Sequence, residues 1–386
     1  MPVRRWVMSE TYAPIGGKLW TKPFQILFTL AVVGIALMGY RFLFGLGAVT
    51  NLNDGYPWGL WIVYDILVAT GLACGGYAMA ILVYAFNRGQ YHPLIRPALL
   101  ASVFGYTLAA AAIVIDTGRY WNLINIFLPG TSNIGNSWMV EVAISISSYI
   151  VILWIELSPV MLEKWNKTKL RRIVHRSMFV IVAFGMLFPT LHQSSLGGLM
   201  IVAGDKLSPL WQTDWLPALF LLSALTMGFA VVVFEAIFSA TVLKRPYEQS
   251  MLSKLAGTIP WMLAAYLILR WGTLLMNGGL SAFAFNAAGI MFIIENLLFI
   301  YPLVVLLSSA NRAKLTQLFY ASISILLAGA VYRFDVFLVG FNPGGGYVYF
   351  PSVAEIMITV GIISIELVAY LFFVKRFPVL PVLKDA

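Results

Sequence analysis

Ten long apolar runs constrain this chain more than any other feature of its sequence. Each has about twenty residues or more, the length a helix needs to cross roughly 30 Å of hydrocarbon. Of the 386 residues, 60% are hydrophobic and 11% are charged, whereas soluble domains carry about 25% charged residues. The chain is therefore expected to be an all-α, polytopic membrane protein of about ten transmembrane helices, over 23–44, 58–86, 94–115, 138–157, 173–191, 216–243, 255–276, 285–308, 315–340 and 353–374.

The distribution of Lys and Arg predicts the orientation. The N-terminal tail holds four, and every second connection after it is basic, with two at 87–96, six at 160–176, three at 244–254, two at 312–314 and three in the C-terminal tail. The opposite loops hold only Arg119 and Lys206. Under the positive-inside rule both termini are cytoplasmic. The expected organisation is a single membrane domain over 1–386, with tails at 1–22 and 375–386 around a helical bundle at 23–374. The net charge of +9 then reflects orientation and not a nucleic-acid partner.

Cysteine and histidine content excludes two kinds of redox centre. One cysteine, Cys74, cannot hold an iron–sulfur cluster, which needs about four thiolates. Of the three histidines, His92 falls in a cytoplasmic loop, His175 at the cytoplasmic start of span five and His192 at its outer end, with a loop expected at 192–198. The last two are about 25 Å apart along a helix and cannot clamp one haem. We expect neither haem nor cluster on this chain.

Ionisable residues inside the spans are functional candidates, because a charge at the bilayer centre costs roughly 2.5–3.5 kcal/mol. The set includes Asp65, Asp116, Arg119, Glu141, Glu156, His192, Glu235, Arg270, Glu295, Arg333, Asp335 and Glu366. In span four, Glu141, Ser145, Ser148 and Glu156 share one face over about 22 Å. Such a stripe could carry protons, or its serines could let helices approach closely. Arg333 and Asp335 face opposite ways and fit structural pairing with other helices.

A weak internal repeat bears on the architecture. Spans four and eight each place a Glu early, Glu141 and Glu295, and spans three and seven end near Arg119 and Arg270. Four helices separate each pair, so the two halves would run parallel. This spacing suggests two four-helix bundles plus two extra helices.

Seven short blocks spread over the whole length carry a resemblance to a known family. They are RFLFGLG (41–47), YPWG (56–59), FNRGQYHPL (86–94), RPALLAS (96–102), GRYWN (118–122), PTLHQSS (189–195) and FNPGGGY (341–347). With these blocks the chain resembles, nearly end to end, the HybB-type membrane subunits of hydrogenase-2-type nickel–iron hydrogenases. Those subunits belong to the NrfD/polysulfide-reductase membrane-subunit family.

The resemblance implies partners, a substrate and site residues. In that family the subunit binds no haem. It takes electrons from a periplasmic four-cluster ferredoxin-like subunit, itself fed by the hydrogenase small and large subunits, and passes them to menaquinone. The positions that match residues implicated in quinone and proton handling are Tyr106, Glu141, His192 and Glu235. Depth and charge add Asp65, Asp116 and Arg119 to His192 as candidate quinone-pocket residues.

The sequence thus predicts the membrane subunit of a hydrogen:quinone oxidoreductase in the bacterial cytoplasmic (inner) membrane, surrounded by lipid. Quinone would bind near the outer ends of spans two to five. Acidic side chains would deliver the two protons that quinone reduction consumes, and proton translocation is compatible with this arrangement. Two alternatives stay open. A family member serving polysulfide, nitrite or another partner enzyme would use the same site, and a proton-coupled transporter would also explain acidic residues at mid-membrane.

Overall fold

The computed structural model describes residues 12–128 and 137–382. Arg4, Arg5 and Lys384, which contribute to the predicted orientation, lie outside these ranges. Within the described residues, ten helical segments are long and apolar enough to cross a membrane: Lys22–Phe44, Trp61–Ala85, Gly89–Asp116, Trp138–Lys164, Thr168–Ile201, Leu216–Val242, Gln249–Met276, Ala287–Leu307, Leu315–Val339 and Val353–Arg376. The predicted all-α membrane fold with ten spans is confirmed.

Several spans are built from more than one element. The α-helices are α1 (Lys22–Phe44), α2 (Ala69–Leu72), α3 (Gly75–Ala80), α4 (Ile95–Asp116), α5 (Trp138–Lys164), α6 (Thr168–Ile201), α7 (Leu216–Val242), α8 (Gln249–Ala256), α9 (Ile259–Met276), α10 (Ala287–Leu307), α11 (Ser309–Arg312), α12 (Leu315–Phe334) and α13 (Val353–Arg376). Short 3₁₀ turns are η2 (Leu46–Ala48), η5 (Gly89–Leu94), η6 (Tyr120–Phe127), η7 (Gly204–Lys206) and η8 (Gly279–Ala282), and π-helical segments are η3 (Trp61–Val68), η4 (Ile81–Ala85) and η9 (Asp335–Val339).

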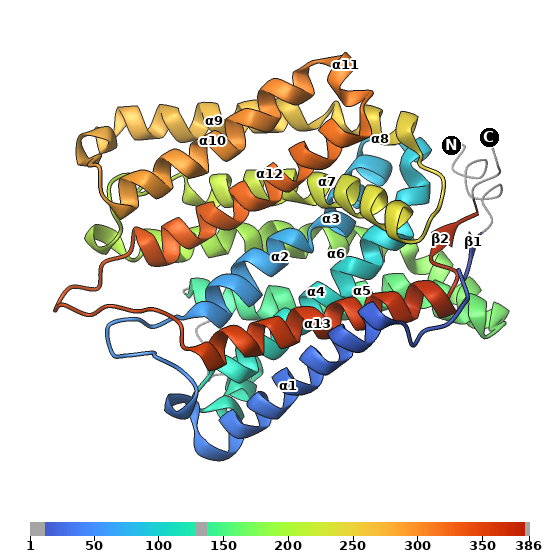
Figure 1. The fold of residues 1–386 in the computed structure, drawn as a ribbon, viewed down its shortest axis with the longest axis horizontal. Helices are drawn as coiled ribbons and strands as arrows, with labels where there is room; N and C mark the ends of the chain where they lie inside the picture. Colours follow the sequence, from blue (N-terminus) through green and yellow to red (C-terminus); the bar gives the residue numbers. More distant parts are fainter. Residues whose placement is uncertain (1–11, 129–136, 383–386) are drawn as a thin grey trace.

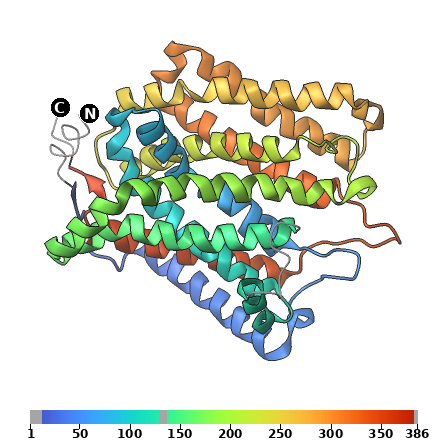
Figure 2. The same ribbon diagram turned by 180° about the vertical axis from the view of Figure 1, so that it is seen from behind.

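Spans two to five and spans six to nine each close into a four-helix bundle. In the first bundle α3 contacts α4 and α6, and α5 packs against both α4 and α6. In the second bundle α7 contacts α9 and α12, and α10 packs against both of these helices. The long α7 also contacts α3 and α6, so it joins the bundles, while α1 and α13 pair beside α4 (Figure 1). Figure 2 shows the extended α5–α6 pair from behind. The structure has the predicted two bundles plus two helices.

Both described ends of the chain lie at one end of the bundle, which we name the termini face (Figure 1). There β1 (Tyr12–Ala13) pairs antiparallel with β2 (Leu380–Pro381). Arg96 fastens this region, because its guanidinium lies over the ring of Tyr12, at 3.8 Å, and donates to Glu163, at 3.0 Å. The opposite end, the distal face, carries the long loops before η3 and α13 (Figure 1).

Span two is irregular and lies at the centre of the protein. It consists of η3, α2, α3 and η4, with a break at Ala73–Cys74. Ser102 of α4 pairs with backbone groups on both sides of the break. Its hydroxyl donates to the Ala73 carbonyl, at 2.6 Å, and accepts from the Gly76 N–H, at 2.9 Å. Of the most apolar 18 residues of this span 83% are buried, against 17% for α1. Protein therefore surrounds the irregular backbone, and hydrogen bonds within the protein satisfy its polar groups, as a membrane interior requires.

One predicted loop is wrong. The polar run at 192–198 was expected to form an outer loop, but α6 continues through it to Ile201. The hydroxyl groups of Ser194 and Ser195 turn back and donate to the Leu191 carbonyl, at 2.9 and 2.8 Å, so they need no water. His192 accordingly lies inside a helix and is 0% exposed, not at the end of the span.

Candidate functional site

A chain of buried polar groups begins at His192 of α6. Its Nδ1 lies 3.1 Å from the Phe188 carbonyl, which can only accept, so Nδ1 carries the hydrogen. In the neutral ring Nε2 is then the acceptor. Two donors point at it, the Tyr106 hydroxyl at 3.0 Å and the Gln193 amide nitrogen at 3.0 Å. The surroundings thus favour a neutral imidazole that accepts a hydrogen bond from Tyr106.

Tyr106 of α4 links this histidine to the break in span two. Its hydroxyl also lies 3.6 Å from the Cys74 sulfur, and Cys74 donates to the Thr70 carbonyl, at 3.2 Å. The Tyr149 ring of α5 packs edge-on against Tyr106, with centroids 4.6 Å apart. Tyr106, Tyr149 and Cys74 are buried. Groups from α2, α4, α5 and α6 therefore converge on one polar point inside the first bundle.

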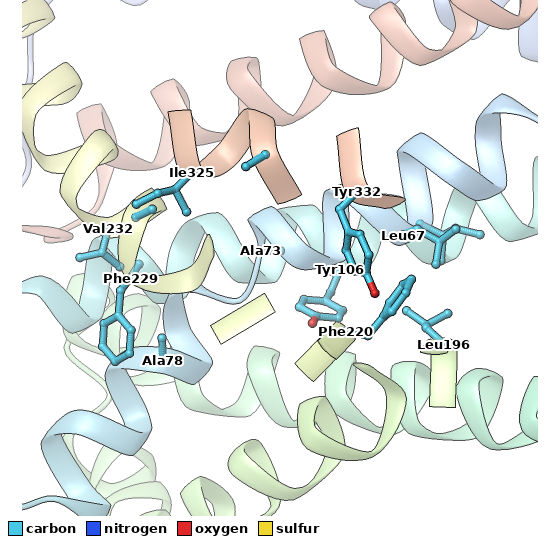
Figure 3. Close-up of a cluster of buried hydrophobic side chains, with 14 of the residues drawn as sticks. Leu67, Ala73, Ala78, Tyr106, Leu196, Phe220, Phe229, Val232, Ile325 and Tyr332 are labelled. Carbon is cyan, nitrogen blue, oxygen red and sulfur yellow. The ribbon is translucent and has the colours of Figure 1, made fainter. Parts of the chain in front are cut away.

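Arg333 of α12 connects this point to the second bundle. It donates to the Gln193 side-chain oxygen, at 3.2 Å, and to the Ser223 hydroxyl of α7, at 3.3 Å. The absence of a side chain at Gly71 makes room, since a Cβ there would lie 3.2 Å from the guanidinium carbon. Tyr106 belongs to the surrounding apolar cluster together with Phe220 and Tyr332 (Figure 3).

Arg333 is 0% exposed, and its hydrogen-bond acceptors in the described part of the chain are all neutral. Asp335 does not contact Arg333; it opens η9, which packs against α10, and it interacts electrostatically with Glu295 of that helix. The expectation that Arg333 and Asp335 face opposite ways is confirmed. A buried cation without a carboxylate partner gives the junction of the two bundles a positive potential, which favours a ligand that gains negative charge.

A second polar line runs along one face of α13. Its members lie at 355, 359, 366 and 370. Thr359 donates to the Asp65 carboxylate of η3, at 2.8 Å, and Tyr370 donates to Glu235 of α7. Glu366 lies beside the residue preceding Tyr106, because a Cβ on Gly105 would be 3.5 Å from its Oε1. This line, which we call the α13 line, approaches the first site, the network of Tyr106 and His192, from the termini face.

Glu355 ends the α13 line at the distal face. Its carboxylate accepts from the Ser352 N–H, at 2.8 Å, the Asn51 N–H, at 3.0 Å, and the Tyr349 hydroxyl, at 2.5 Å. Burial raises the pKa of Tyr349, so this hydroxyl stays protonated and remains a donor. These bonds fix the start of α13 against the loop before span two.

Near the termini face, Glu235 borders a small cleft of about 40 Å³, which is also lined by Ser239, Arg245 and Pro381. Arg245 donates to the Pro381 carbonyl. The cleft offers water-sized access to Glu235, which accepts from Tyr370, the member of the α13 line nearest the termini face.

The remaining predicted site residues do not gather into one pocket with His192. Asp116 ends α4, where Arg41 donates to the flanking carbonyls of Ile115, at 2.6 Å, and Thr117, at 2.7 Å. Arg119 is exposed on the distal face. Asp65 faces α13, on another side of span two from His192.

Glu141 lies in the first turn of α5 and is partly buried. Tyr149, eight residues further on, is the α5 residue beside His192, with ring centroids 6.4 Å apart. Eight residues span about 12 Å along a helix. At the other end of the predicted span-four stripe, Glu156 packs against Gly185 of α6.

Gln193, Thr359 and Tyr370 were not predicted as site residues, and Arg333 was not predicted as a partner of His192 and Tyr106. A signal for Thr359 and Tyr370 existed in the sequence, because positions 355, 359, 366 and 370 recur with the spacing of one helix face. For Gln193 the expected loop concealed the helical context. Arg333 was noted, but its partners lie more than 100 residues away in the sequence and leave no local pattern.

Fold and site together define a multi-pass helical membrane protein with a buried Tyr–His–Gln–Arg network where two four-helix bundles meet. Residues 48–342 match the family described as "Polysulphide reductase, NrfD". The chain belongs to this family.

Individual relatives agree with this assignment. The chain is 47% identical over 383 residues, 98% of its own length and 97% of the relative's, to the "Probable Ni/Fe-hydrogenase 2 b-type cytochrome subunit" of Escherichia coli (strain K12). It is 32% identical over 373 residues, 92% and 95% of the two lengths, to a protein of Nitratidesulfovibrio vulgaris. A "Menaquinone reductase, integral membrane subunit" of the same organism is 31% identical over 248 residues, 59% of this chain and 56% of the relative.

The first relative's name implies a b-type haem, which needs two axial ligands. His175 is exposed near the start of α6, about 25 Å along that helix from His192. Both ring nitrogens of His192 already have protein partners. His92 lies in η5, at the termini face. Over residues 12–128 and 137–382 these histidines do not fit a haem held by a histidine pair.

Proposed function

We infer that the chain is the membrane subunit of a nickel–iron hydrogenase complex that reduces menaquinone. The buried network of Tyr106, His192, Gln193 and Arg333 is the observation that carries this proposal. It combines a proton-exchanging pair with an uncompensated positive charge, in a family that includes a menaquinone reductase subunit. The chain is 47% identical to a hydrogenase-2 subunit over 98% of its length, and this similarity supports the choice of partner enzyme.

The chemistry explains why both features belong to one site. Menaquinone takes up two electrons and two protons to become menaquinol. Electron arrival makes the quinone oxygens more basic and negative, and Arg333 stabilises that charge. Tyr106, whose hydroxyl lies 3.0 Å from Nε2 of neutral His192, then passes protons to the quinone one at a time and is reprotonated after each transfer. The membrane subunit binds and protonates the quinone.

The electrons come from outside this chain. One cysteine among 386 residues cannot hold an iron–sulfur cluster. We assign this task to a four-cluster ferredoxin-like subunit at the distal face, fed by the hydrogenase small and large subunits. With both termini cytoplasmic, this face is periplasmic and the protein lies in the bacterial inner membrane.

Replacement protons enter from the termini face. Glu235 meets the small cleft there and accepts from Tyr370, and the α13 line leads through Glu366 to Gly105, next to Tyr106. Spacings along this line exceed single hydrogen bonds in places, so water completes it. Protons taken up from the cytoplasmic side would contribute to charge separation across the membrane.

The test is purification in mild detergent followed by two assays on one preparation. We expect hydrogenase and iron–sulfur subunits to co-purify, and hydrogen to reduce both an artificial dye and a menaquinone analogue. Co-purification with a different oxidoreductase, together with quinone reduction by that enzyme's substrate, would keep the site and replace the partner. A complex that reduces dye with hydrogen but never quinone contradicts the proposal.

A further inference from the structure

Two carboxyl groups lie together in the second bundle, away from Tyr106 and His192. Glu295 is on α10, Asp335 opens η9, and each is 0% exposed. Helix α10 packs against η9, and the two carboxyl groups lie within electrostatic reach of each other. Yet neither oxygen of Asp335 has a donor among the described residues. Ionised carboxylates only accept, so a hydrogen bond between these groups requires a proton on one of them.

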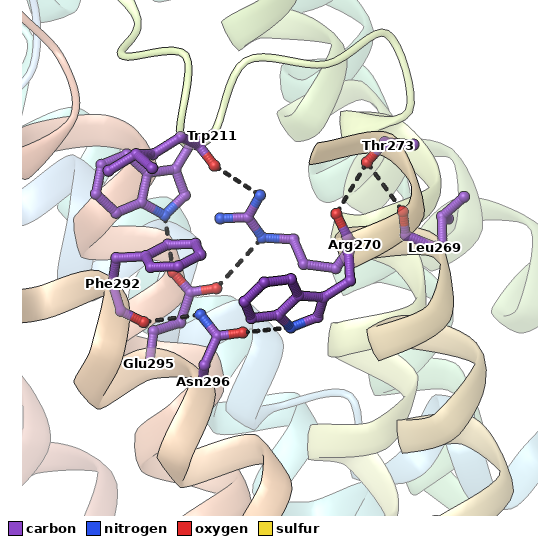
Figure 4. Close-up of polar contacts among 9 residues, drawn as sticks. Trp211, Leu269, Arg270, Thr273, Phe292, Glu295 and Asn296 are labelled. Atoms are coloured by element: carbon purple, nitrogen blue, oxygen red, sulfur yellow. Dashed lines mark hydrogen bonds and ion pairs between the residues drawn. The ribbon is translucent and has the colours of Figure 1, made fainter. Parts of the chain in front are cut away.

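The donors at this place are directed to Glu295. The Trp211 ring nitrogen donates to Oε2, at 2.7 Å, and Nε of Arg270 lies 3.5 Å from Oε1 (Figure 4). Another guanidinium nitrogen of Arg270 donates to the Leu210 carbonyl, at 2.7 Å. Glu295 is therefore the member of the pair suited to carry the negative charge, and Asp335 the member suited to carry a proton.

Charge balance leads to the same assignment. The groups that face the pair are Tyr266 and Arg270 of α9, Trp211 of the loop before α7, and Tyr332 of α12. Arg270 is the cation among them. Arg333 is two residues from Asp335, about 200° around the helix, and donates to the other side. Two ionised carboxylates would leave one uncompensated negative charge in a dry interior, which is strongly unfavourable. One proton makes the group neutral.

We propose that Glu295 and Asp335 form a second proton-binding site, which holds one proton between two carboxyl groups beside Arg270. It is separate from the first site, because the packed rings of Phe220 and Tyr332 lie between Arg333 and Arg270. The ligand is a proton. The hydroxyl groups of Tyr266 and Tyr332, buried and without a partner in the described residues, are the groups available to exchange it. The proposal does not rest on quinone chemistry.

The shared proton is tested by infrared difference spectra between H₂O and D₂O. They are recorded on the intact purified complex without hydrogen or quinone. The wild type should show a C=O stretching band of a protonated carboxylic acid that shifts on exchange into D₂O. Asp335→Asn should remove the band, because Glu295 then ionises against Arg270. Glu295→Gln should remove it too, because Asp335 becomes the partner of Arg270 and ionises. Glu163→Gln, at a partly exposed ion pair with Arg96, should keep the band.

Each other outcome contradicts the proposal. A wild type without such a band would mean that both groups are ionised. A band that survives Asp335→Asn belongs elsewhere, and one that survives Glu295→Gln but not Asp335→Asn belongs to Asp335 alone. If Glu295→Gln does not assemble, Asp335→Glu serves instead. It keeps a carboxyl group and should restore a band that Asp335→Asn lacks, and failure to do so counts against the pair.

Discussion

Gly34 of α1 and Gly361 of α13 pack backbone against backbone. A Cβ added to Gly34 would lie 2.6 Å from the Cα of Gly361, which is closer than real contacts allow. The pair lies where α1, otherwise largely exposed to lipid, meets the rest of the protein. Small residues at such crossings let membrane helices pack closely.

The first prediction follows from this contact. Gly34→Val should push α1 from α13 and lower stability by about 1–3 kcal/mol, the usual range for overpacking. The measurement is thermal unfolding of the purified complex in detergent. Gly39→Val is the matched control, because a Cβ at Gly39 meets nothing within 4 Å. Equal destabilisation by both would show that glycine at these positions acts through helix propensity alone.

The second prediction concerns the Tyr106 hydroxyl. Tyr106→Phe keeps the ring but removes the donor to His192, so quinone reduction with hydrogen should fall by about 100-fold or more, in the range of a lost acid–base group. Hydrogen oxidation with an artificial dye should not change. Tyr320→Phe, on the exposed side of α12, is the control and should keep both activities. Normal quinone reduction by Tyr106→Phe would remove this hydroxyl from the mechanism.

The third prediction concerns proton entry. Glu235→Gln can still accept a hydrogen bond from Tyr370 but cannot exchange a proton. Quinone reduction should become slow while dye reduction continues, and Tyr370→Phe should slow it in the same direction. Glu163→Gln is the control at the same face. If Glu235→Gln is as fast as the wild type, protons enter by another route.

The fourth prediction concerns Glu141. Glu141→Gln should leave assembly and dye reduction intact and impair electron transfer from hydrogen to quinone. Because Tyr149 and not Glu141 lies beside His192, the effect should be smaller than that of Tyr106→Phe. Both variants are assayed on one membrane preparation. An effect of Glu141→Gln as large as that of Tyr106→Phe would place the quinone nearer the distal end of α5 than we propose.

The fifth prediction tests the docking face. Arg119→Glu reverses a charge exposed on the distal face and should release the iron–sulfur subunit during purification. Lys169→Glu, at the start of α6 near the termini face, is the charge-matched control and should leave the complex assembled. The reverse pattern would mean that the partner binds at the termini face.

The sequence predicted the fold far better than the site. Span ends came out within a few residues for α1, α7 and α13, because apolar length and flanking charge are local properties. The end of α6 did not, since a polar run reads as a loop unless its buried partners are known. The sequence named His192 and Tyr106 as candidates for one function, and their side chains lie 3.0 Å apart, yet Gln193 and Arg333 join them through contacts across the two bundles. Such contacts depend on which helices pack, and no local spacing encodes them.

The π-helical segment η3 has a consequence for the length of span two. A π turn is equivalent to one surplus residue in an α-helix. If Trp61–Val68 became a regular α-helix with all its residues kept, the surplus residue would rotate one side of the span against the other by about 100°. Asp65 could then no longer meet Thr359 while Thr70 meets Gln193. The π-helical turns of η3 therefore hold the α13 line and the histidine site in register along span two.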